Sequence, residues 1–386
     1  MDARIKAAIF LPNLEIGGAE NLVLNLIEAF LESDEFAFHL VLLGRGGKLT
    51  DRAMALRGRN DFQFTELGLP LAYGWSAAKV LNRFLTLQGI TLIHSHLYEC
   101  DKTCVLLKLL NPRVKIISTK HSTLRHPWKT AAMNFLSQFL FAKIVFITPY
   151  QREFYRRNYL VFRNTALVEN GAVLPIADPG AAPVSPGQGE REIRLACIGS
   201  FRREKGQDIL ITALNILGRK SVRFRCDLFG DGPDRDKLEK AMEPGANVHF
   251  NEARPGISGE LHRFDLIIIP SRREGSCLIM LESFLAKVPV LASDYPVLAE
   301  KAGGGRRSAL FKSEDAADLA GKIEAFLENP ADQRRLVEPA YRYALDFSIG
   351  RTAENYLRLY REAAGGEETS MAVAGPTQRN MESHDT

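Results

Sequence analysis

Two glutamates, Glu274 and Glu282, frame the stretch of the sequence whose residue types most clearly imply chemistry. Nearly every position from Cys277 to Ala286 is apolar, and this pattern predicts a helix buried inside a large domain. A carboxylate within such a helix, as Glu282 provides, is unfavourable unless a polar partner hydrogen-bonds it. The polar turn before the helix, which contains Glu274, indicates that the helix N-terminus opens onto a ligand, and such ends attract anions. The stretch therefore predicts a site for a polar, anionic ligand.

Two glycine-containing turns could add phosphate contacts. Gly17 and Gly18 stand between a predicted strand and a predicted helix, where paired glycines let a ligand approach the backbone closely. Read alone, a simple tight turn explains this pair better, because no Gly-x-Gly-x-x-Gly dinucleotide fingerprint is present. The second turn, Gly199–Gly206, follows a strand and is basic, so it could neutralise a diphosphate. An exposed charged loop is the alternative interpretation.

Histidines mark the carboxyl ends of two predicted strands. His94 and His96 end one strand, and His121 follows the next. In a cleft such a histidine can donate a hydrogen bond or transfer a proton, although we expect a structural role for at least one of the first two. Zinc is an alternative, but no carboxylate or cysteine has convincing ligand spacing. Asp234 and Asp236 form an Asp-x-Asp pattern at a helix start, which we interpret as capping, so we expect no metal site.

These residues need elements to position them, and both halves of the chain alternate short apolar strands with helical patterns. In the first half we predict strands at 5–11, 38–43, 91–95, 114–119 and 143–148, and helices at 19–31, 76–87, 131–141 and 149–159. In the second half we predict strands at 193–198, 224–229, 248–250, 266–270, 288–292 and 310–311, and helices at 207–217, 234–242, 277–286 and 316–327. The result is an α/β fold of two Rossmann-like, doubly wound domains. Ligands of such sheets bind at the carboxyl ends of the strands, so a cleft between the domains is the expected active site.

Composition places the domain boundaries. Residues 175–190 lose periodicity and are rich in Pro, Gly, Ala and Ser, which is typical of a linker. We therefore predict an N-terminal domain at 1–174 and a C-terminal domain at 191–345. A last amphipathic helix at 346–364 is expected to pack back toward the N-terminal domain, and the polar segment 365–386 is expected to be disordered.

The bulk properties are those of a soluble globular protein. The 386 residues are 46% hydrophobic and 25% charged, and no run of ~18 apolar residues could span a bilayer. The start of the sequence leads directly into a strand pattern, so we predict no signal peptide. The five scattered cysteines suit reduced thiols, and we expect a cytoplasmic location and no structural disulfide.

The net charge of +4 is unevenly distributed. From Arg113 to Arg163 the sequence has ten Lys and Arg residues but a single acid, Glu153, and it also contains several aromatic residues. This composition predicts a basic surface with aromatic anchors, suited to an anionic membrane or an acidic substrate. A solvated basic face over a core helix is an equally good interpretation.

Taken in order, these residues resemble the retaining GT-B glycosyltransferases, in particular glycosyltransferase family 4. Pro270–Gly275 together with Glu282 resembles that family's hallmark, two glutamates separated by seven residues. The resemblance covers roughly residues 5 to 362. Further similar segments are Gly17-Gly18-Ala19-Glu20, Thr119-Lys120-His121, Glu169-Asn170-Gly171, Lys205-Gly206, Gly230-Asp231-Gly232-Pro233 and Glu300.

The resemblance implies an acceptor-binding first domain and a second domain that binds a nucleotide-sugar. Glu282 would bind the ribose, Glu274 and His121 would contact the donor sugar, and Lys205 would help to hold the diphosphate. His121, Glu274 and Lys205 are the implied catalytic residues. The implied donor-binding residues are Gly17, Gly18, Arg202, Arg203, Lys205, Gly230, Gly232, Pro233, Gly275, Ser276, Cys277, Leu278 and Glu282. No metal and no other cofactor is implied, because fixed cations and N–H groups can stabilise the leaving diphosphate.

One position departs from the family pattern. Ser200 stands where many members have an arginine, and Arg202 or Arg203 is the candidate replacement. The implied function is hexosyl transfer from a UDP- or GDP-sugar to a glycan or lipid-linked acceptor in cell-surface polysaccharide or glycolipid synthesis. The alternatives are an inert GT-B subunit that binds a partner glycosyltransferase and a GT-B sugar-nucleotide epimerase. We expect no nucleic-acid partner, and a cytoplasmic enzyme that could be peripheral on the inner face of the membrane.

Overall fold

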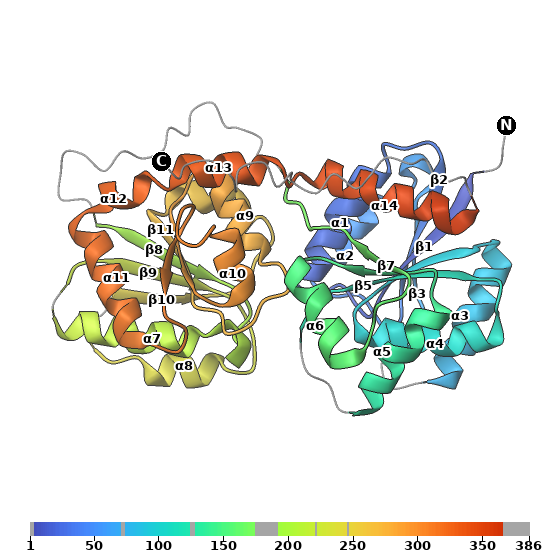
Figure 1. The fold of residues 1–386 in the computed structure, drawn as a ribbon, viewed down its shortest axis with the longest axis horizontal. Coiled ribbons are helices and arrows are strands. Elements are labelled where there is room, and N and C mark those ends of the chain that lie inside the picture. The colour runs from blue at the N-terminus through green and yellow to red at the C-terminus, as the bar shows by residue number, and fades with distance from the viewer. Residues whose placement is uncertain are drawn as a thin grey trace, which may run out of the picture.

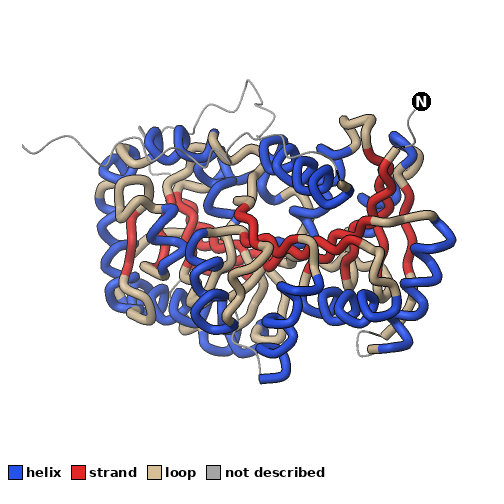
Figure 2. The backbone as a smooth tube through the Cα atoms, turned by 45° about the vertical axis from the view of Figure 1, so that its right-hand side comes forward, coloured by secondary structure: helices blue, strands red, loops and turns tan. Residues whose placement is uncertain are grey.

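The computed structural model describes residues 4–70, 74–123, 128–173, 192–220, 222–244 and 247–365. Two lobes stand side by side, and each has a parallel sheet between two layers of helices (Figures 1 and 2). This arrangement confirms the predicted α/β class of two Rossmann-like domains. The predicted linker at 175–190 and residues 366–386 of the predicted tail lie outside the described residues.

The first sheet has seven strands in the order β3-β2-β1-β4-β5-β6-β7. They are β1 (Ile5–Leu11), β2 (Phe36–Leu42), β3 (Gln63–Glu66), β4 (Leu92–His96), β5 (Lys115–Lys120), β6 (Lys143–Phe146) and β7 (Thr165–Leu167). The helices of this lobe are α1 (Gly18–Phe30), α2 (Thr50–Ala55), the short 3-10 helix η1 (Arg59–Asp61), α3 (Trp75–Gln88), α4 (Tyr98–Leu110), α5 (Trp128–Leu140) and α6 (Pro149–Tyr159).

The second sheet has six strands in the order β10-β9-β8-β11-β12-β13. They are β8 (Arg194–Ile198), β9 (Arg225–Phe229), β10 (Asn247–Asn251), β11 (Leu266–Ile269), β12 (Val290–Ser293) and β13 (Ala309–Phe311). Its helices are η2 (Arg203–Lys205), α7 (Gln207–Arg219), α8 (Arg235–Ala241), η3 (Ile257–Arg263), α9 (Leu278–Leu285), α10 (Pro296–Lys301), α11 (Ala316–Glu328), α12 (Pro330–Arg334) and α13 (Val337–Leu345).

Strand β1 shows how helices cover both faces of each sheet. Its residues from Ala7 onward are buried, as expected for a parallel strand with helices on both faces. Ile9 packs with α1, α2 and the last helix on one face, whereas the next residue, Phe10, packs with α3, α4 and α6 on the other. In the second lobe, α7, α8 and α11 cover one face of the sheet, and α9, η3 and α13 cover the other.

The last helix, α14 (Ile349–Ala364), leaves the second lobe and packs on the first (Figure 1). It lies against α1, and the rings of Tyr356 and Tyr360 are fully buried in the core of the first lobe. Just before this helix, Ser348 forms an isolated β-bridge with Ala172. The end of the first lobe thus pairs with the segment through which the chain returns to it.

The predicted elements lie within three residues of observed ones, and β1 and α6 have the predicted bounds. Helix α4 was not predicted, because Asp101 and Thr103 interrupt its apolar pattern although both are buried. The short or polar elements α2, β3, α10, α12 and α13 were also missed.

Candidate active site

The loops at the carboxyl ends of the two sheets touch each other. His121 follows β5 in the first lobe, and Gly275 lies between β11 and α9 in the second. A Cβ built on Gly275 would lie 2.1 Å from the carbonyl oxygen of His121, so only a residue without a side chain fits there. Beside this contact, the hydroxyls of Thr123 and Tyr295 lie 3.2 Å apart across the same boundary.

Lys205 and Glu274 form an ion pair in the second lobe at this boundary. Lys205 Nζ lies 2.7 Å from Glu274 Oε1, and the same oxygen accepts a hydrogen bond of 2.7 Å from the hydroxyl of Ser271. Burial by itself lowers the pKa of Lys205, but the neighbouring Glu274 carboxylate opposes this and the pKa is raised above its usual value. The Glu274 side chain is buried and holds the ammonium in its charged form.

The N-terminus of α9 follows this ion pair directly. Cys277 precedes the helix in the left-handed region, with φ of +55°, and the first backbone N–H groups of a helix have no partner within the helix. Ser276 is 4% exposed, yet its Oγ has no hydrogen-bond partner. Leu278 begins the helix itself. The N-terminus of α9, a buried unpaired hydroxyl and the charge of Lys205 are therefore neighbours, a combination that suits an oxyanion.

Glu282 lies on the second turn of α9, where it is half-buried. Burial raises the pKa of its carboxyl group, and a hydrogen bond with Ser258 in η3 opposes that rise. Ser258 is thus the partner that an acid in this apolar helix requires.

Close backbone packing shapes the wall opposite α9. Gly206, with φ of +69°, lies so near the carbonyl oxygen of Pro270 that an added Cβ would approach it to 2.0 Å. Gly230 likewise packs against the carbonyl of Gly199, and Gly232 packs against the carbonyl of Phe201. Pro233 follows at the surface. Gly206, Gly230 and Gly232 therefore allow close backbone packing at the carboxyl ends of β8, β9 and β11.

Other predicted donor residues lie at the surface. Gly17, which is partly exposed, is the N-cap of α1, and Gly18 begins that helix; an added Cβ would meet the Glu20 carboxylate at Gly17 but no atom within 4 Å at Gly18. Arg202 and Arg203 are exposed on the turn that leads into η2. Ser200 accepts a hydrogen bond from Gln207 through its backbone carbonyl. These contacts do not place either arginine in the position expected at Ser200.

Two groups of hydrogen-bonded side chains, joined by a contact between two histidine rings, lead from α14 to His121. Tyr360 is linked to His94 (Oη to Nδ1, 2.6 Å), His94 to Thr119 (Nε2 to Oγ1, 2.8 Å), and Thr119 to Tyr356 (3.0 Å). His96 lies against His94 with ring centroids 4.0 Å apart.

His96 in turn links the network to His121, with 2.9 Å between His96 Nδ1 and His121 Nε2. Burial lowers the pKa of His121 to about 4, so the imidazole is neutral near pH 7. Since Nε2 is engaged by His96, the remaining ring nitrogen of His121 is the one available to a ligand.

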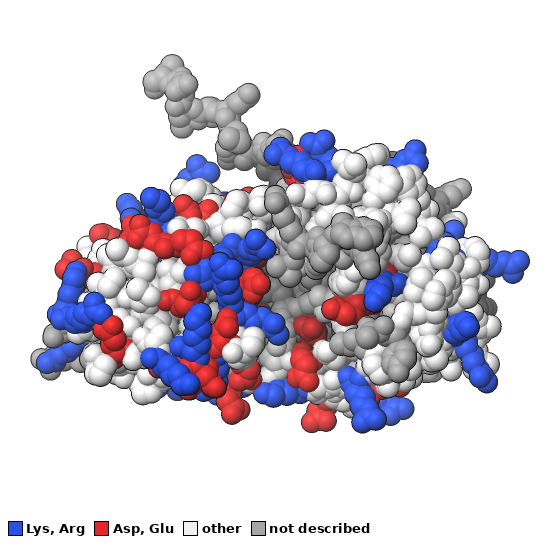
Figure 3. Space-filling view, turned by 90° about the horizontal axis from the view of Figure 1, so that it is seen from below, with Lys and Arg blue, Asp and Glu red and all other residues white. Residues whose placement is uncertain are grey.

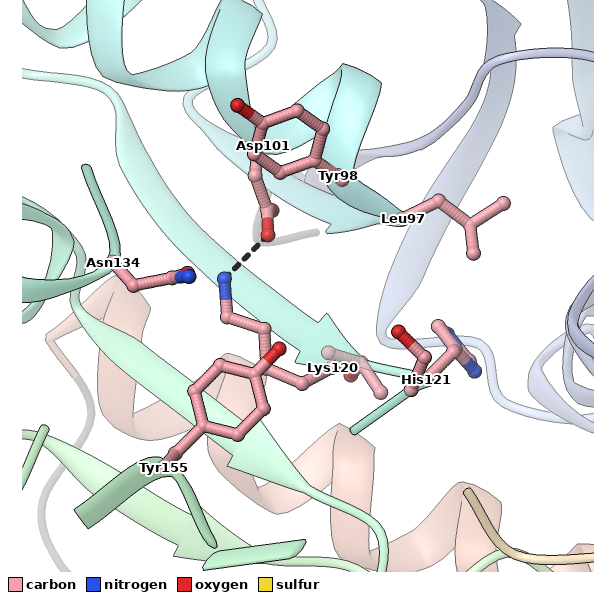
Figure 4. A pocket seen from close by; sticks show the side chains of 9 residues that line it. Leu97, Tyr98, Asp101, Lys120, His121, Asn134 and Tyr155 are labelled. Atoms are coloured by element: carbon pink, nitrogen blue, oxygen red, sulfur yellow. Dashed lines mark hydrogen bonds and ion pairs between the residues drawn. The ribbon is translucent and has the colours of Figure 1, made fainter. Parts of the chain in front are cut away.

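A polar pocket opens beside His121 in the first lobe (Figure 4). An ion pair at its wall joins Lys120 Nζ to Asp101 Oδ2 at 2.5 Å, and Asp101 Oδ1 accepts hydrogen bonds of 2.7 Å from Ser95 and Ser118. The other lining residues are Leu97, Tyr98, Thr119, Ser122, Asn134 and Tyr155.

Sequence reasoning missed most of this pocket. Asp101 and Asn134 come from helices and carry no motif, and only the position of Lys120 between Thr119 and His121 indicated that the region has a function. Within the described ranges, no group of three or more His, Cys, Asp and Glu side chains could hold a metal ion. Over the same ranges no helix is long and apolar enough to cross a membrane.

Two family models match the chain, one on each lobe. The model described as Glycosyltransferase Family 4 matches residues 16–174, and the model described as Glycosyl transferases group 1 matches residues 182–343.

Individual relatives are distant. An uncharacterized glycosyltransferase of Methanocaldococcus jannaschii is 24% identical over 76% of this chain and 81% of its own length. The D-inositol 3-phosphate glycosyltransferase of Rhodococcus erythropolis is 27% identical over 51% of this chain and 48% of its own.

Solved structures share the fold at low identity. A glycosyltransferase from Rickettsia africae superposes with a TM-score of 0.75 at 14% identity, covering 95% of this chain and 100% of that one. Anabaena HepE in complex with UDP-glucose superposes with a TM-score of 0.74 at 16% identity, covering 92% and 99%.

Proposed function

The chain belongs to glycosyltransferase family 4 and has the GT-B fold, and on this premise we propose that it transfers a hexose from a UDP- or GDP-sugar to a glycan or lipid-linked acceptor, with retention of anomeric configuration. The pathway we propose is the synthesis of a cell-surface polysaccharide or glycolipid. The proposed enzyme works in the cytoplasm, at the inner face of the membrane.

The observation that carries the proposal is the start of α9. Ser276 offers a buried hydroxyl without a partner, and the N-terminus of the helix, where N–H groups can be directed at a ligand, follows two residues later. Native proteins rarely leave a buried polar atom unsatisfied, so such an atom in a loop between two lobes favours a bound ligand. A diphosphate fits these donors, since its oxygens accept hydrogen bonds and carry negative charge.

Lys205 and Glu274 would supply the electrostatic part of the reaction. Sugar transfer breaks the bond between the anomeric carbon and the diphosphate, so negative charge grows on the departing oxygen. The ammonium of Lys205 is held charged by Glu274 and can oppose that charge without rearrangement. We propose on this basis that the reaction needs no metal ion and no other cofactor.

His121 and Glu282 would hold the two ends of the donor. As a neutral imidazole fixed by His96, His121 can exchange one hydrogen bond with a sugar hydroxyl while its ring stays in place. Glu282 lies farther along α9 and can accept hydrogen bonds from the ribose hydroxyls. The Anabaena HepE structures with UDP and with UDP-glucose support a nucleotide-sugar of this kind.

Donor binding is the first test. We expect one or more sugar nucleotides in a panel of UDP-, GDP- and ADP-sugars to raise the melting temperature of the full chain. A UDP- or GDP-sugar should also be slowly hydrolysed, with release of free sugar and nucleoside diphosphate. An ADP-sugar as the sole ligand would contradict the proposed donor, and the absence of any shift would contradict the proposed site.

The same experiment separates the alternatives. The serine at position 200 is the reason to test whether the protein is an inert subunit. Such a subunit would bind a donor without hydrolysing it or transferring sugar from it to any acceptor. An epimerase would convert the sugar nucleotide without an acceptor. Once an acceptor is found, the anomeric coupling constant of the product by NMR tests retention, and full rate in the presence of a strong chelator tests metal independence.

A further inference from the structure

We propose that the first lobe docks on an anionic lipid bilayer through an apolar surface formed by α5 and the loop that follows α6. We call it the α5 surface, and its residues are Phe135, Leu136, Phe139, Leu160 and Phe162. Each of these side chains is between 37% and 60% exposed. Exposed apolar groups of this size are usual as single residues, but a contiguous group marks an interaction site.

Exposed apolar side chains are concentrated in this lobe. Among the described residues, twelve of the thirteen large apolar side chains that are exposed lie in the first lobe or at its end, and Leu345 is the exception. Figure 3 views the molecule from the side on which α5 lies in Figure 1, and the first lobe there is mostly uncharged, with scattered Lys and Arg side chains and some acidic ones toward the boundary with the second lobe. The second lobe in the same view is crowded with charges of both signs.

The α5 surface is continuous because Gln138 joins its two segments. This side chain is fully buried; its Nε2 donates to the carbonyl of Leu160 at 3.0 Å, and its Oε1 accepts from the N–H groups of Phe162 and Arg163 at 3.2 and 3.1 Å. The loop is thereby held against α5. A surface that is already ordered loses little conformational freedom on binding.

The charges around the α5 surface select the partner. The guanidinium of Arg163 lies 5.4 Å from the ring centroid of Phe139, and Arg152, Arg156 and Arg157 are exposed on α6, the helix that leads into the loop of this surface. Glu153 on the same helix pairs with Arg156 and Arg157.

Apolar side chains surrounded by cations match the boundary between the acyl chains and the head groups of anionic lipids. A second copy of the chain would bring arginines against arginines in a symmetric contact, which disfavours self-association.

Not every cation of the basic stretch from Arg113 to Arg163 is available to a membrane. Lys120 lies inside the lobe in its ion pair with Asp101, and Lys143 pairs with Glu362 on α14. These two lysines therefore contribute little to the surface, although both belong to the basic stretch of the sequence. Binding through the α5 surface should accordingly depend on its aromatic residues as well as on charge.

Docking in this orientation has a consequence for the substrate, and this step rests on the proposed function. Asn134 lines the pocket beside His121, and the next two residues of α5 belong to the α5 surface. One helix thus has the pocket on its inner side and the bilayer on its outer side. The acceptor class favoured by this arrangement is a lipid whose polar head reaches the boundary between the lobes while its chains stay in the membrane.

Vesicle flotation of the full chain tests the docking. We expect flotation with vesicles of equal parts phosphatidylglycerol and phosphatidylcholine, and much less with phosphatidylcholine alone. In the double variant Phe139→Ser/Phe162→Ser, the fraction of protein bound to the vesicles should fall about tenfold or more. Its matched control, Met54→Ser/Leu345→Ser, changes two side chains of similar exposure elsewhere and should float like wild type. Arg152→Gln/Arg163→Gln should weaken the preference for phosphatidylglycerol.

Three results would overturn the proposal: no flotation of the wild type, equal flotation of the Phe139/Phe162 variant and its control, or a dimer in sedimentation that the same variant dissociates. Because the substituted residues are exposed and lie outside the donor site, the donor-induced rise in melting temperature should be the same in all variants. A normal donor response without flotation would contradict docking alone, whereas flotation without a donor response would contradict the proposed function alone.

Discussion

The carbonyl oxygen of His121 occupies the space that a Cβ of Gly275 would need, with 2.1 Å between the oxygen and that Cβ position. The two residues come from different lobes, so this contact sets how closely the lobes approach each other at the site. A contact below 3.0 Å with a backbone atom cannot be relieved by moving a side chain.

The variant Gly275→Ala should therefore separate the lobes locally and slow sugar transfer. A displacement of about 1 Å can lower a rate by ~10²-fold, and we expect a loss of that order in kcat with the fold intact. Gly259→Ala is the control, because an added Cβ there meets no atom within 4 Å. Steady-state kinetics and thermal melting check this. A Gly275→Ala enzyme with normal kcat would show that sugar transfer does not need the close contact between Gly275 and the carbonyl of His121.

Removing the ammonium of Lys205 should impair the reaction itself. For Lys205→Ala we expect a loss of ~10²–10³ in kcat at saturating donor, as for the removal of an oxyanion donor. Lys237→Ala, on the exposed side of α8, is the matched control. If Lys205→Ala turned over at nearly the wild-type rate, Lys205 would have no part in stabilising the leaving group.

Two serines near α9 distinguish a ligand-binding hydroxyl from a structural one. Ser276 Oγ has no partner, so Ser276→Ala should leave the free energy of unfolding unchanged or slightly higher, but should reduce the stabilisation by donor. Ser283 Oγ donates to the carbonyl of Ile279 at 2.6 Å. Ser283→Ala should therefore lower the free energy of unfolding by ~1 kcal/mol and leave the donor effect unchanged. Melting with and without donor measures both, and the opposite pattern would contradict the assignment of Ser276.

The buried histidines should make stability depend on pH. Burial lowers the pKa of His94, His96 and His121 below the ordinary value of 6.5, for His121 to about 4. The unfolded chain therefore binds protons on these groups between about pH 6.5 and pH 4, while the folded chain does not. Their contribution to stability is complete above pH 6.5 and is lost as the pH falls through this window, at up to ~1.4 kcal/mol per pH unit for each histidine.

Urea unfolding at several pH values measures this dependence. A His94→Gln variant should have a shallower decrease in unfolding free energy below pH 6.5 than wild type, even if it is less stable at pH 7. Acids with a raised pKa, such as Glu282, make the folded protein more stable as the pH falls toward 5, which opposes the effect of the histidines. These acids are present in both the wild type and the His94→Gln variant, so they do not affect the comparison. The variant His249→Gln changes an exposed histidine and should keep the wild-type slope; equal slopes for all three proteins would refute the prediction.

The sequence predicted the regular elements well where local signals were strong. Helix α6 has its predicted bounds because Pro149 occupies its first turn and Thr148 caps it through Gln151 N–H. Helix α4 was missed because the burial of Asp101 depends on Lys120, a residue nineteen positions away whose contact no local pattern reveals. Tertiary pairing decided that element.

The site was predictable to a similar degree. The motifs indicated Lys205 and Glu274 as members of one site, and the structure brings their charged groups to 2.7 Å. The roles of these residues toward a donor remain predictions. Most of the pocket beside His121 could not be predicted, because its other residues come from α4 and its N-cap, the loop after β5, α5 and α6 and share only a position in space.

The docking of α14 gives the first lobe a discontinuous sequence. Tyr356 and Tyr360 fill the core beside β1 and hydrogen-bond to Thr119 and His94, so the first lobe is complete only when a helix from near residue 350 has been added. During synthesis from the N-terminus, the second lobe leaves the ribosome before that helix does. The core of the first lobe can therefore be completed only after the sequence of its neighbour has been synthesised.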